Sequence, residues 1–234
     1  MTAQRLTPAD AGEAADLVAF LARLIHWDKT AVVRLQGHGS ALAVFGQPPF
    51  GGGVLAVRTV EIAAPVELDT TVSAGQLLEG IDEQVGLVSV PPAVTGKPWA
   101  GVLPPQGGWK RVAELAADDL RGAAAAAVRE FRARSEELDS QRRTRAGLDA
   151  LADEIWSRQL GGSGLPLRAV HAAQALGFLR PVRAGASSAA GGGEGAGAEP
   201  LALLAAGPWL RLRTPYGSIA VRRAGLGALS VAPV

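Results

Sequence analysis

The spacing of apolar residues changes several times along these 234 residues. Near the N-terminus they recur every three or four positions, which is typical of an amphipathic helix. They then form short β-rich runs broken by glycine and proline, return to helical spacing, and end in β-rich runs again. This order predicts an α+β protein with an N-terminal helix plus antiparallel β-meander, central long helices and a C-terminal β-hairpin unit.

The first helix is predicted to begin at Pro8 and to end near residues 26–29. Asp10 and Glu13 are the acidic residues expected in a first helical turn. Three strands should follow as a meander packed on this helix, with a hairpin connection at 37–40. They are predicted at 30–36, 41–45 and 54–63.

A second, short helix is predicted after Ser73. Gln76 lies three residues on, which completes a capping-box pattern, and the helix should extend over Leu77, Leu78 and Ile81. Residues 91–108 are rich in Pro, Gly and Trp and show no periodicity, so we predict the domain boundary there. The two predicted domains span residues 1–100 and 101–234.

The strongest helical signal runs from Trp109 to about Glu137. Its Ala-rich stripe favours close packing against another helix, which leads us to expect a homodimer, although packing within one chain would satisfy the stripe equally well. Further helices are predicted at 146–158 and 166–176, the second ending at Gly177. The members of the stripe are Val112, Leu115, Leu120, Ala123, Ala127 and Phe131.

The C-terminal part is predicted to be β. Residues 184–200 are almost wholly Ala, Gly and Ser, so we expect a flexible loop between strands at 178–183 and 201–206. Thr214-Pro215-Tyr216-Gly217 reads as a turn, with Pro and Gly at favoured positions.

A hairpin closed by this turn pairs Arg213 with Ser218 and Trp209 with Arg222. Because side chains alternate along a strand, its apolar side chains fall on one face and its cationic ones on the other. The second face suggests phosphate or base binding, and the candidate nucleic-acid-binding residues are Trp209, Arg211, Arg213, Arg222 and Arg223. The alternative is structural: Arg222 covers the Trp209 ring in a cation–π contact.

Two helices followed by a hairpin resemble the order of elements in a winged helix–turn–helix. Such a protein presents polar and cationic side chains from its second helix to a DNA groove. Here that helix offers Arg168, His171 and Gln174 amid Leu, Ala and Val.

The chain has few residues of the types that carry most enzyme chemistry. It holds three histidines, one tyrosine and no cysteine, and His26, His38 and His171 lie in separate regions. None has a partner at metal-ligand or triad spacing nearby, so we predict no catalytic residues, no metal and no cofactor. In the run His26-Trp27-Asp28-Lys29, neighbouring side chains diverge, and a structural junction is favoured over a catalytic dyad.

A small-molecule pocket or unrecognised enzyme site is a further hypothesis, at the aromatic 97–109 loop. Its candidate ligand-binding residues are His26, Lys97, Trp99 and Trp109. Gly107 and Gly108 would lead into the predicted helix and expose backbone N–H groups to an anion. The alternative is that the Trp side chains fill a seam between the two halves of the protein.

Charge is unevenly distributed: residues 1–100 carry a net −4 and residues 101–234 a net +5. The basic C-terminal half fits an anionic partner. A GC-rich genome is a competing cause, because only three of the 23 cationic residues are lysine. The first residues lack the apolar core of a signal peptide, and no stretch is apolar enough to span a membrane, so we expect a cytoplasmic protein without membrane contact.

The arginine bias, together with His26-Trp27-Asp28-Lys29 and Pro215-Tyr216-Gly217-Ser218, resembles conserved cytoplasmic proteins of actinobacteria that have no assigned function. This resemblance implies no site residues. We therefore predict a non-enzymatic interaction, scaffold or regulatory protein that self-associates as a homodimer and binds a protein partner. Nucleic-acid binding through the hairpin and the small-molecule site are the alternatives.

Overall fold

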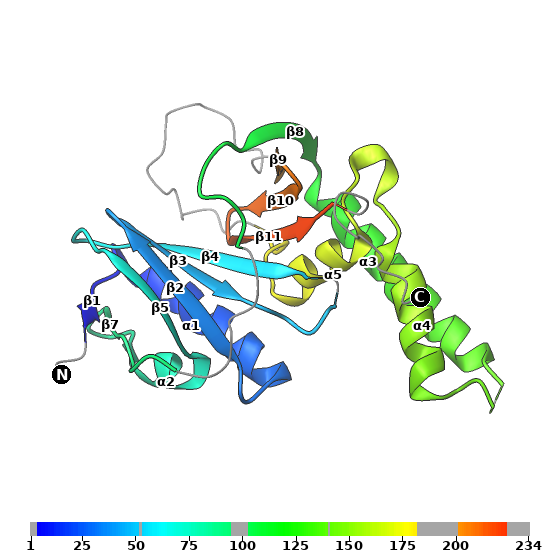
Figure 1. The fold of residues 1–234 in the computed structure, drawn as a ribbon, viewed down its shortest axis with the longest axis horizontal. Coiled ribbons are helices and arrows are strands. Elements are labelled where there is room, and N and C mark those ends of the chain that lie inside the picture. Colours follow the sequence, from blue (N-terminus) through cyan, green and yellow to red (C-terminus); the bar gives the residue numbers. More distant parts are fainter. Residues whose placement is uncertain (1–3, 52, 95–102, 140, 182–200, 224–234) are drawn as a thin grey trace, which may run out of the picture. The chain divides into compact units, whose positions relative to one another are not determined.

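A computed structural model describes residues 4–51, 53–94, 103–139, 141–181 and 201–223 (Figure 1). The chain forms two compact units. Unit 1 contains residues 1–105 and 216–220, and unit 2 contains residues 106–215 and 221–234. Helices and antiparallel strands occur in both, which confirms the α+β class.

The elements of unit 1 are β1 (Arg5–Leu6), α1 (Ala11–Trp27), β2 (Val32–His38), β3 (Ala41–Gly46), β4 (Leu55–Glu61), β5 (Leu68–Ser73), α2 (Ala74–Glu79), β6 (Ile81–Asp82) and β7 (Leu87–Ser89). Unit 2 contains β8 (Lys110–Leu115), α3 (Ala117–Glu137), α4 (Arg145–Ser157), η1 (Gly161–Ser163), α5 (Leu167–Ala175), β9 (Leu201–Ala206) and β10 (Trp209–Thr214). The last strand, β11 (Gly217–Arg222), contributes residues to both units.

Helix α1 forms in the predicted region, but it begins at Ala11 and not at Pro8, because Pro8 forms a β-bridge with Ile62. Asp10 caps its N-terminus, accepting the Glu13 backbone N–H at 2.9 Å. Its apolar stripe is buried, and a Cβ added at Gly46 of β3 would collide with Leu24 and lie in tight contact with Phe20. The helix therefore lies directly on one face of the unit 1 sheet.

The predicted meander is confirmed, because β2, β3 and β4 pair antiparallel in sequence order. The β2–β3 turn contains Gly39 at a φ of +57°, in the left-handed region that glycine tolerates best. Two strands extend the meander: β5 pairs with β2, and Ser218–Ala220 of β11 pairs with Leu55–Val57 of β4.

Several short strands of unit 1 had no counterpart in the sequence prediction. They include β5 and a small sheet in the order β1-β7-β6. Ser73 caps α2 as predicted, with the Gln76 N–H 3.4 Å from its hydroxyl. Ile81 is not part of that helix, because it pairs with Val88 in the small sheet.

In unit 2, three helices accompany the strands β8, β9 and β10. The α3 helix packs against both α4 and α5. Ala127 of α3 is buried in a cluster with Leu151 and Ile155 of α4, and Phe131 packs beside it. The Ala-rich stripe is thus buried within one chain, so the homodimer stays a prediction without the support of that stripe.

The predicted helix from Trp109 to Glu137 is wrong over its first part. Residues 110–115 form β8, which pairs antiparallel with β9, and α3 begins only at Ala117. A bulge between Arg111 and Ala113 interrupts the pairing, and Val112 is 52% exposed. Val112 and Leu115 therefore do not belong to the helical stripe.

The predicted strand at 178–183 is also wrong in its described part. Gly177, at a φ of +72°, ends the α5 segment, and the Phe178 N–H donates to the Ala173 carbonyl at 2.8 Å. Phe178–Arg180 then continue as turns. Strand β9 matches the prediction at 201–206. The predicted flexible loop at 184–200 lies outside the described residues.

The predicted domain boundary at residue 100 stays a prediction. The two compact units divide between residues 105 and 106. In the ranges described, no helix combines the length and hydrophobicity that a bilayer crossing requires.

Candidate interaction surface

Strand pairing in unit 2 brings Trp109, predicted as part of the 97–109 loop site, close to Arg211 of the C-terminal hairpin. Leu204 of β9 pairs with Arg111 of β8 on one side and with Arg211 of β10 on the other. Cross-strand partners share a face of the sheet, as do residues two apart along a strand. Trp109 therefore lies on the same face as Arg211, and the Arg211 guanidinium carbon is 5.7 Å from the centroid of its ring.

The β10–β11 hairpin adds a second contact of the same kind. The Arg222 guanidinium carbon lies 5.3 Å from the centroid of the Trp209 ring, which is the cation–π pair that the sequence predicted. The Arg223 N–H donates to the Pro208 carbonyl at 2.8 Å, as expected from the predicted register. Trp209 is only 4% exposed, so its ring is not available for a base to stack on.

We call Arg111, Arg211, Arg213 and Arg222 the cationic face; Arg223 follows at the end of β11. Glu114, whose β9 partner Ala202 also pairs with Arg213, accepts a hydrogen bond from Arg111 at 2.5 Å. In the described part of the chain, Arg213, Arg222 and Arg223 form no ion pair. This positive charge is not neutralised within the described part of the protein.

The electrostatic consequence is visible at Arg211. Burial, and secondly the positive charge of Arg213, lower the pKa of the Arg211 guanidinium below its ordinary value. Both effects oppose the charged form of the side chain. An anion at this face would relieve the repulsion between the two guanidinium groups.

The other predicted ligand-binding residues do not form a described site. His26 is exposed on the last turn of α1, in unit 1, whereas Trp109 belongs to unit 2. Lys97 and Trp99 lie outside the described residues. Gly107 and Gly108 precede strand β8, so the expected anion site at a helix N-terminus is wrong.

The run after His26 is a structural junction in the described structure. Asp28 accepts hydrogen bonds from the backbone N–H and the hydroxyl of Thr30, at 2.8 and 2.7 Å. Trp27 packs edge-on against Phe50, with 5.2 Å between their ring centroids. These contacts fix the chain between α1 and the strands.

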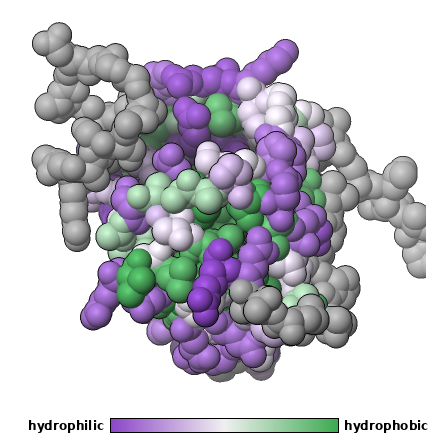
Figure 2. All heavy atoms as spheres, turned by 90° about the vertical axis from the view of Figure 1, so that its left-hand side faces the viewer, coloured by the Kyte–Doolittle hydropathy of each residue, from purple (hydrophilic) through white to green (hydrophobic). Residues whose placement is uncertain are grey.

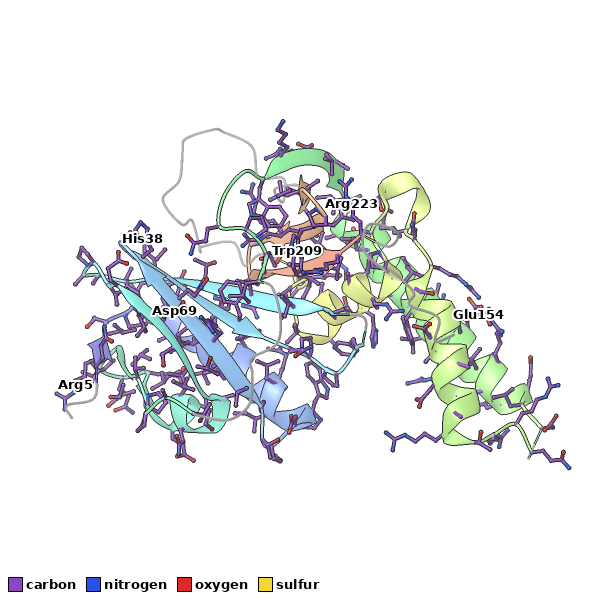
Figure 3. The ribbon with its side chains drawn as sticks, viewed as in Figure 1. Arg5, His38, Asp69, Glu154, Trp209 and Arg223 are labelled. Carbon is purple, nitrogen blue, oxygen red and sulfur yellow. The ribbon has the colours of Figure 1, made fainter. Side chains whose placement is uncertain are left out.

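One histidine does contact an acid. Nδ1 of His38 lies 2.8 Å from a Glu67 carboxylate oxygen, but the two side chains are 87% and 76% exposed. Figure 3 places His38 near the tip of the β2–β3 hairpin. A pair this open to solvent does not resemble the enclosed acid–base centre of an enzyme.

The polar side chains of α5 are held within unit 2. Arg168 donates to Asp153 of α4 at 2.7 Å, and the His171 ring stacks on Trp156 with 4.4 Å between centroids. Burial lowers the pKa of His171. Gln174 is exposed, but a recognition helix contacts the bases through several side chains, and one exposed glutamine does not provide them.

Sequence reasoning missed a buried ion pair in unit 1. The Arg58 side chain of β4 is 6% exposed and donates to Glu13 of α1 at 2.8 Å, with Asp16 at 3.3 Å. The signal was an arginine within the run from Val54 to Val60, whose other residues are apolar except for Thr59. Desolvation raises the pKa of Glu13, and Arg58 partly offsets that rise.

Metal binding has no described geometry to support it. Within the described ranges, no three His, Asp or Glu side chains come close enough together to hold a metal ion. The cationic face is therefore the candidate site with the clearest chemistry.

Comparison with known proteins gives family matches without a function. Residues 1–101 match a family described as "Domain of unknown function (DUF8010)", and residues 104–226 match "Domain of unknown function (DUF8185)". No curated protein and no solved structure matches the chain. The matches confirm the resemblance to proteins without an assigned function, whereas its actinobacterial part stays a prediction. Since the second match covers more than half of the 234 residues, the chain belongs to the family of the domain of unknown function DUF8185.

Proposed function

We propose that the protein is a non-enzymatic interaction protein that binds an anionic macromolecule through the cationic face and Arg223. The observation that carries this proposal is the set of exposed guanidinium groups at Arg213, Arg222 and Arg223, which have no described ion pair. Elsewhere in unit 2, arginines such as Arg134 and Arg158 are paired with acids. Charge that a protein leaves unpaired is available to a partner of opposite sign.

The apolar surface supports the same choice. Among the described residues, the large hydrophobic side chains that are mostly exposed are Val85, at 72%, and Val112. Figure 2 looks onto the end of unit 1 that carries β1, where apolar atoms are bordered by hydrophilic side chains. Obligate protein interfaces bury large apolar side chains, and among the described residues of unit 2 Val112 is the one such side chain that is mostly exposed.

The test compares two charge-matched triple variants. Removing Arg213, Arg222 and Arg223 by alanine substitution should weaken binding to fluorescent heparin at least about tenfold, since several ionic contacts are lost. The control replaces Arg132, Arg142 and Arg145, which are exposed on α3, the loop after it and α4. It should bind like the wild type. Equal loss in both variants, or no heparin binding by the wild type, would refute the proposal.

Two earlier hypotheses remain separate from this proposal. Self-association as a homodimer is tested by sedimentation at micromolar protein, where a monomer would remove it. The small-molecule site at the 97–109 loop has no described pocket to support it, and it stays a prediction.

A further inference from the structure

We infer that the anionic partner of the cationic face is a nucleic acid, and that the face contacts its sugar–phosphate backbone without reading the bases. This inference rests on the proposed function, because it names the partner of the same surface. Three features of unit 2 favour a nucleic acid over an acidic protein.

The first feature is the regular placement of the cations. Arg211 and Arg213 are two residues apart on β10, which separates their Cα atoms by about 6.7 Å on the same face. Arg222 extends the positive charge to β11, whereas the charge of Arg111 on β8 is paired with Glu114. Phosphates repeat at regular steps along a nucleic-acid strand, so cations that lie two residues apart on one strand, with another on the neighbouring strand, contact more than one phosphate at once.

The second feature is the way the guanidinium of Arg222 is held. A cation–π contact over Trp209 positions this group without using its hydrogen-bond donors. A planar guanidinium matches a phosphate in bidentate geometry, and holding it in place lowers the entropy lost on binding. Arg211 over Trp109 repeats the arrangement on the same face.

The third feature is the lack of what a peptide partner needs. An extended peptide adds to an exposed strand edge, but edge strand β8 is bulged between Arg111 and Ala113. Protein interfaces centre on buried apolar and aromatic anchors, whereas nucleic-acid interfaces are polar and strongly positive. The cationic face has the second composition.

The same geometry excludes base stacking on Trp209. A stacking platform needs an open ring, and Trp209 is buried. Trp109 is itself partly buried and lies under Arg211. Contacts limited to phosphates and sugars set position and affinity but carry no sequence information.

The experiment measures fluorescence anisotropy of the full chain with labelled oligonucleotides of equal length, as oligo(dT), oligo(dA), mixed-sequence single strands and duplexes. Labelled poly-glutamate of matched charge is the competing polyanion. We expect oligonucleotide affinities that agree within about threefold, because phosphate contacts do not depend on sequence. The logarithm of the binding constant should fall linearly with the logarithm of the salt concentration. Each alanine substitution at Arg213, Arg222 or Arg223 should reduce the steepness of that line by about 0.7–0.9.

Two variants keep the result interpretable if the alanine triple folds poorly. Replacing the same three arginines by lysine preserves the charge and should keep most of the binding and the salt slope. Trp109→Phe should change the affinity by less than about threefold, since the ring is not a stacking platform.

The outcomes separate the two proposals. If poly-glutamate binds as tightly as the oligonucleotides, the proposed function stands and the nucleic-acid inference fails. If neither polymer binds, the nucleic-acid inference fails, and the heparin measurement decides the proposed function. A preference of more than about tenfold for one base sequence overturns the claim of backbone-only contact, and a large loss in Trp109→Phe with an unchanged salt slope does the same.

Discussion

The guanidinium carbon of Arg211, on β10, lies 5.7 Å from the centroid of the ring of Trp109, which directly precedes β8 and is far from Arg211 in the sequence. We expect this contact to contribute about 0.5–2 kcal/mol to stability. A double-mutant cycle of Trp109→Leu and Arg211→Met in urea denaturation measures the coupling directly. A coupling energy within error of zero would show that the two side chains are neighbours without mutual stabilisation.

Gly46 is expected to be intolerant of any side chain. A Cβ there collides with Leu24 and meets Phe20, both in α1, so Gly46→Ala should lower the free energy of unfolding by about 1–3 kcal/mol. Gly122, within α3, is the matched control because nothing lies within 4 Å of its added Cβ. Gly122→Ala should raise stability by up to about 1 kcal/mol through helix propensity. Equal effects at the two positions would contradict the close packing of α1 on β3.

Burial of His171 makes stability depend on pH. Its pKa is lowered from the ordinary value of 6.5, so the unfolded chain binds a proton more readily than the folded one. The free energy of unfolding should therefore fall as pH drops through 6.5, and level off below the folded pKa. Urea denaturation across this range should show the dependence in the wild type and lose this contribution in His171→Gln. The control His26→Gln, at an exposed histidine, should retain it; identical profiles for all three proteins would rule out the mechanism.

Glu154 links the surfaces of α3 and α4. It accepts hydrogen bonds from Arg134 at 2.7 and 2.8 Å and from Arg158 at 2.9 Å. These bonds, led by those of Arg134, lower the pKa of Glu154 from 4.5 to about 2. Its contribution to stability is thus present above 4.5 and is lost as pH falls towards 2.

Glu154→Gln should accordingly lower the melting temperature at neutral pH and low salt, with a smaller difference near pH 2 or in high salt. Asp149→Asn serves as the control, because the ion pair that Asp149 forms within the described residues is a longer one, at 3.9 Å, to the exposed Arg145. A drop in melting temperature that persists unchanged in high salt would indicate a packing effect instead.

Replacing Arg58 alone should lower the free energy of unfolding strongly, whereas replacing it together with its acidic partners should lower it much less. Arg58→Met leaves Glu13 and Asp16 as partly buried acids without their counter-charge, so we expect a loss of about 3 kcal/mol. Changing the acids as well, to Gln and Asn, should restore much of that stability. Urea denaturation of the single and triple variants decides; a harmless Arg58→Met would mean that the ion pair contributes nothing.

Much of the local structure was predictable because its causes are local. Asp10, Ser73 and Thr144 each accept a backbone N–H three residues on, and each opens a helix. The Trp209–Arg222 contact was likewise predictable, since a tight turn and a period of two fix which residues of a hairpin share a face.

The contact between Trp109 and Arg211 was not predictable in this way. Val112 and Leu115 are three residues apart, which fits a helix as well as an irregular strand. A helix that begins at Trp109 does not pair with a neighbouring strand, so the helical prediction gave no indication that Trp109 lies near Arg211.

The sequence alone determined where the capped helices α1, α2 and α4 begin and how the hairpins turn, because capping, glycine conformation and side-chain alternation act within a few residues. The tertiary structure decided that β8 pairs with β9 and that Ser218–Ala220 pairs with β4. A strand is completed by hydrogen bonds to a partner elsewhere in the chain, and no local pattern specifies that partner. The cationic face exists only once those pairings are made.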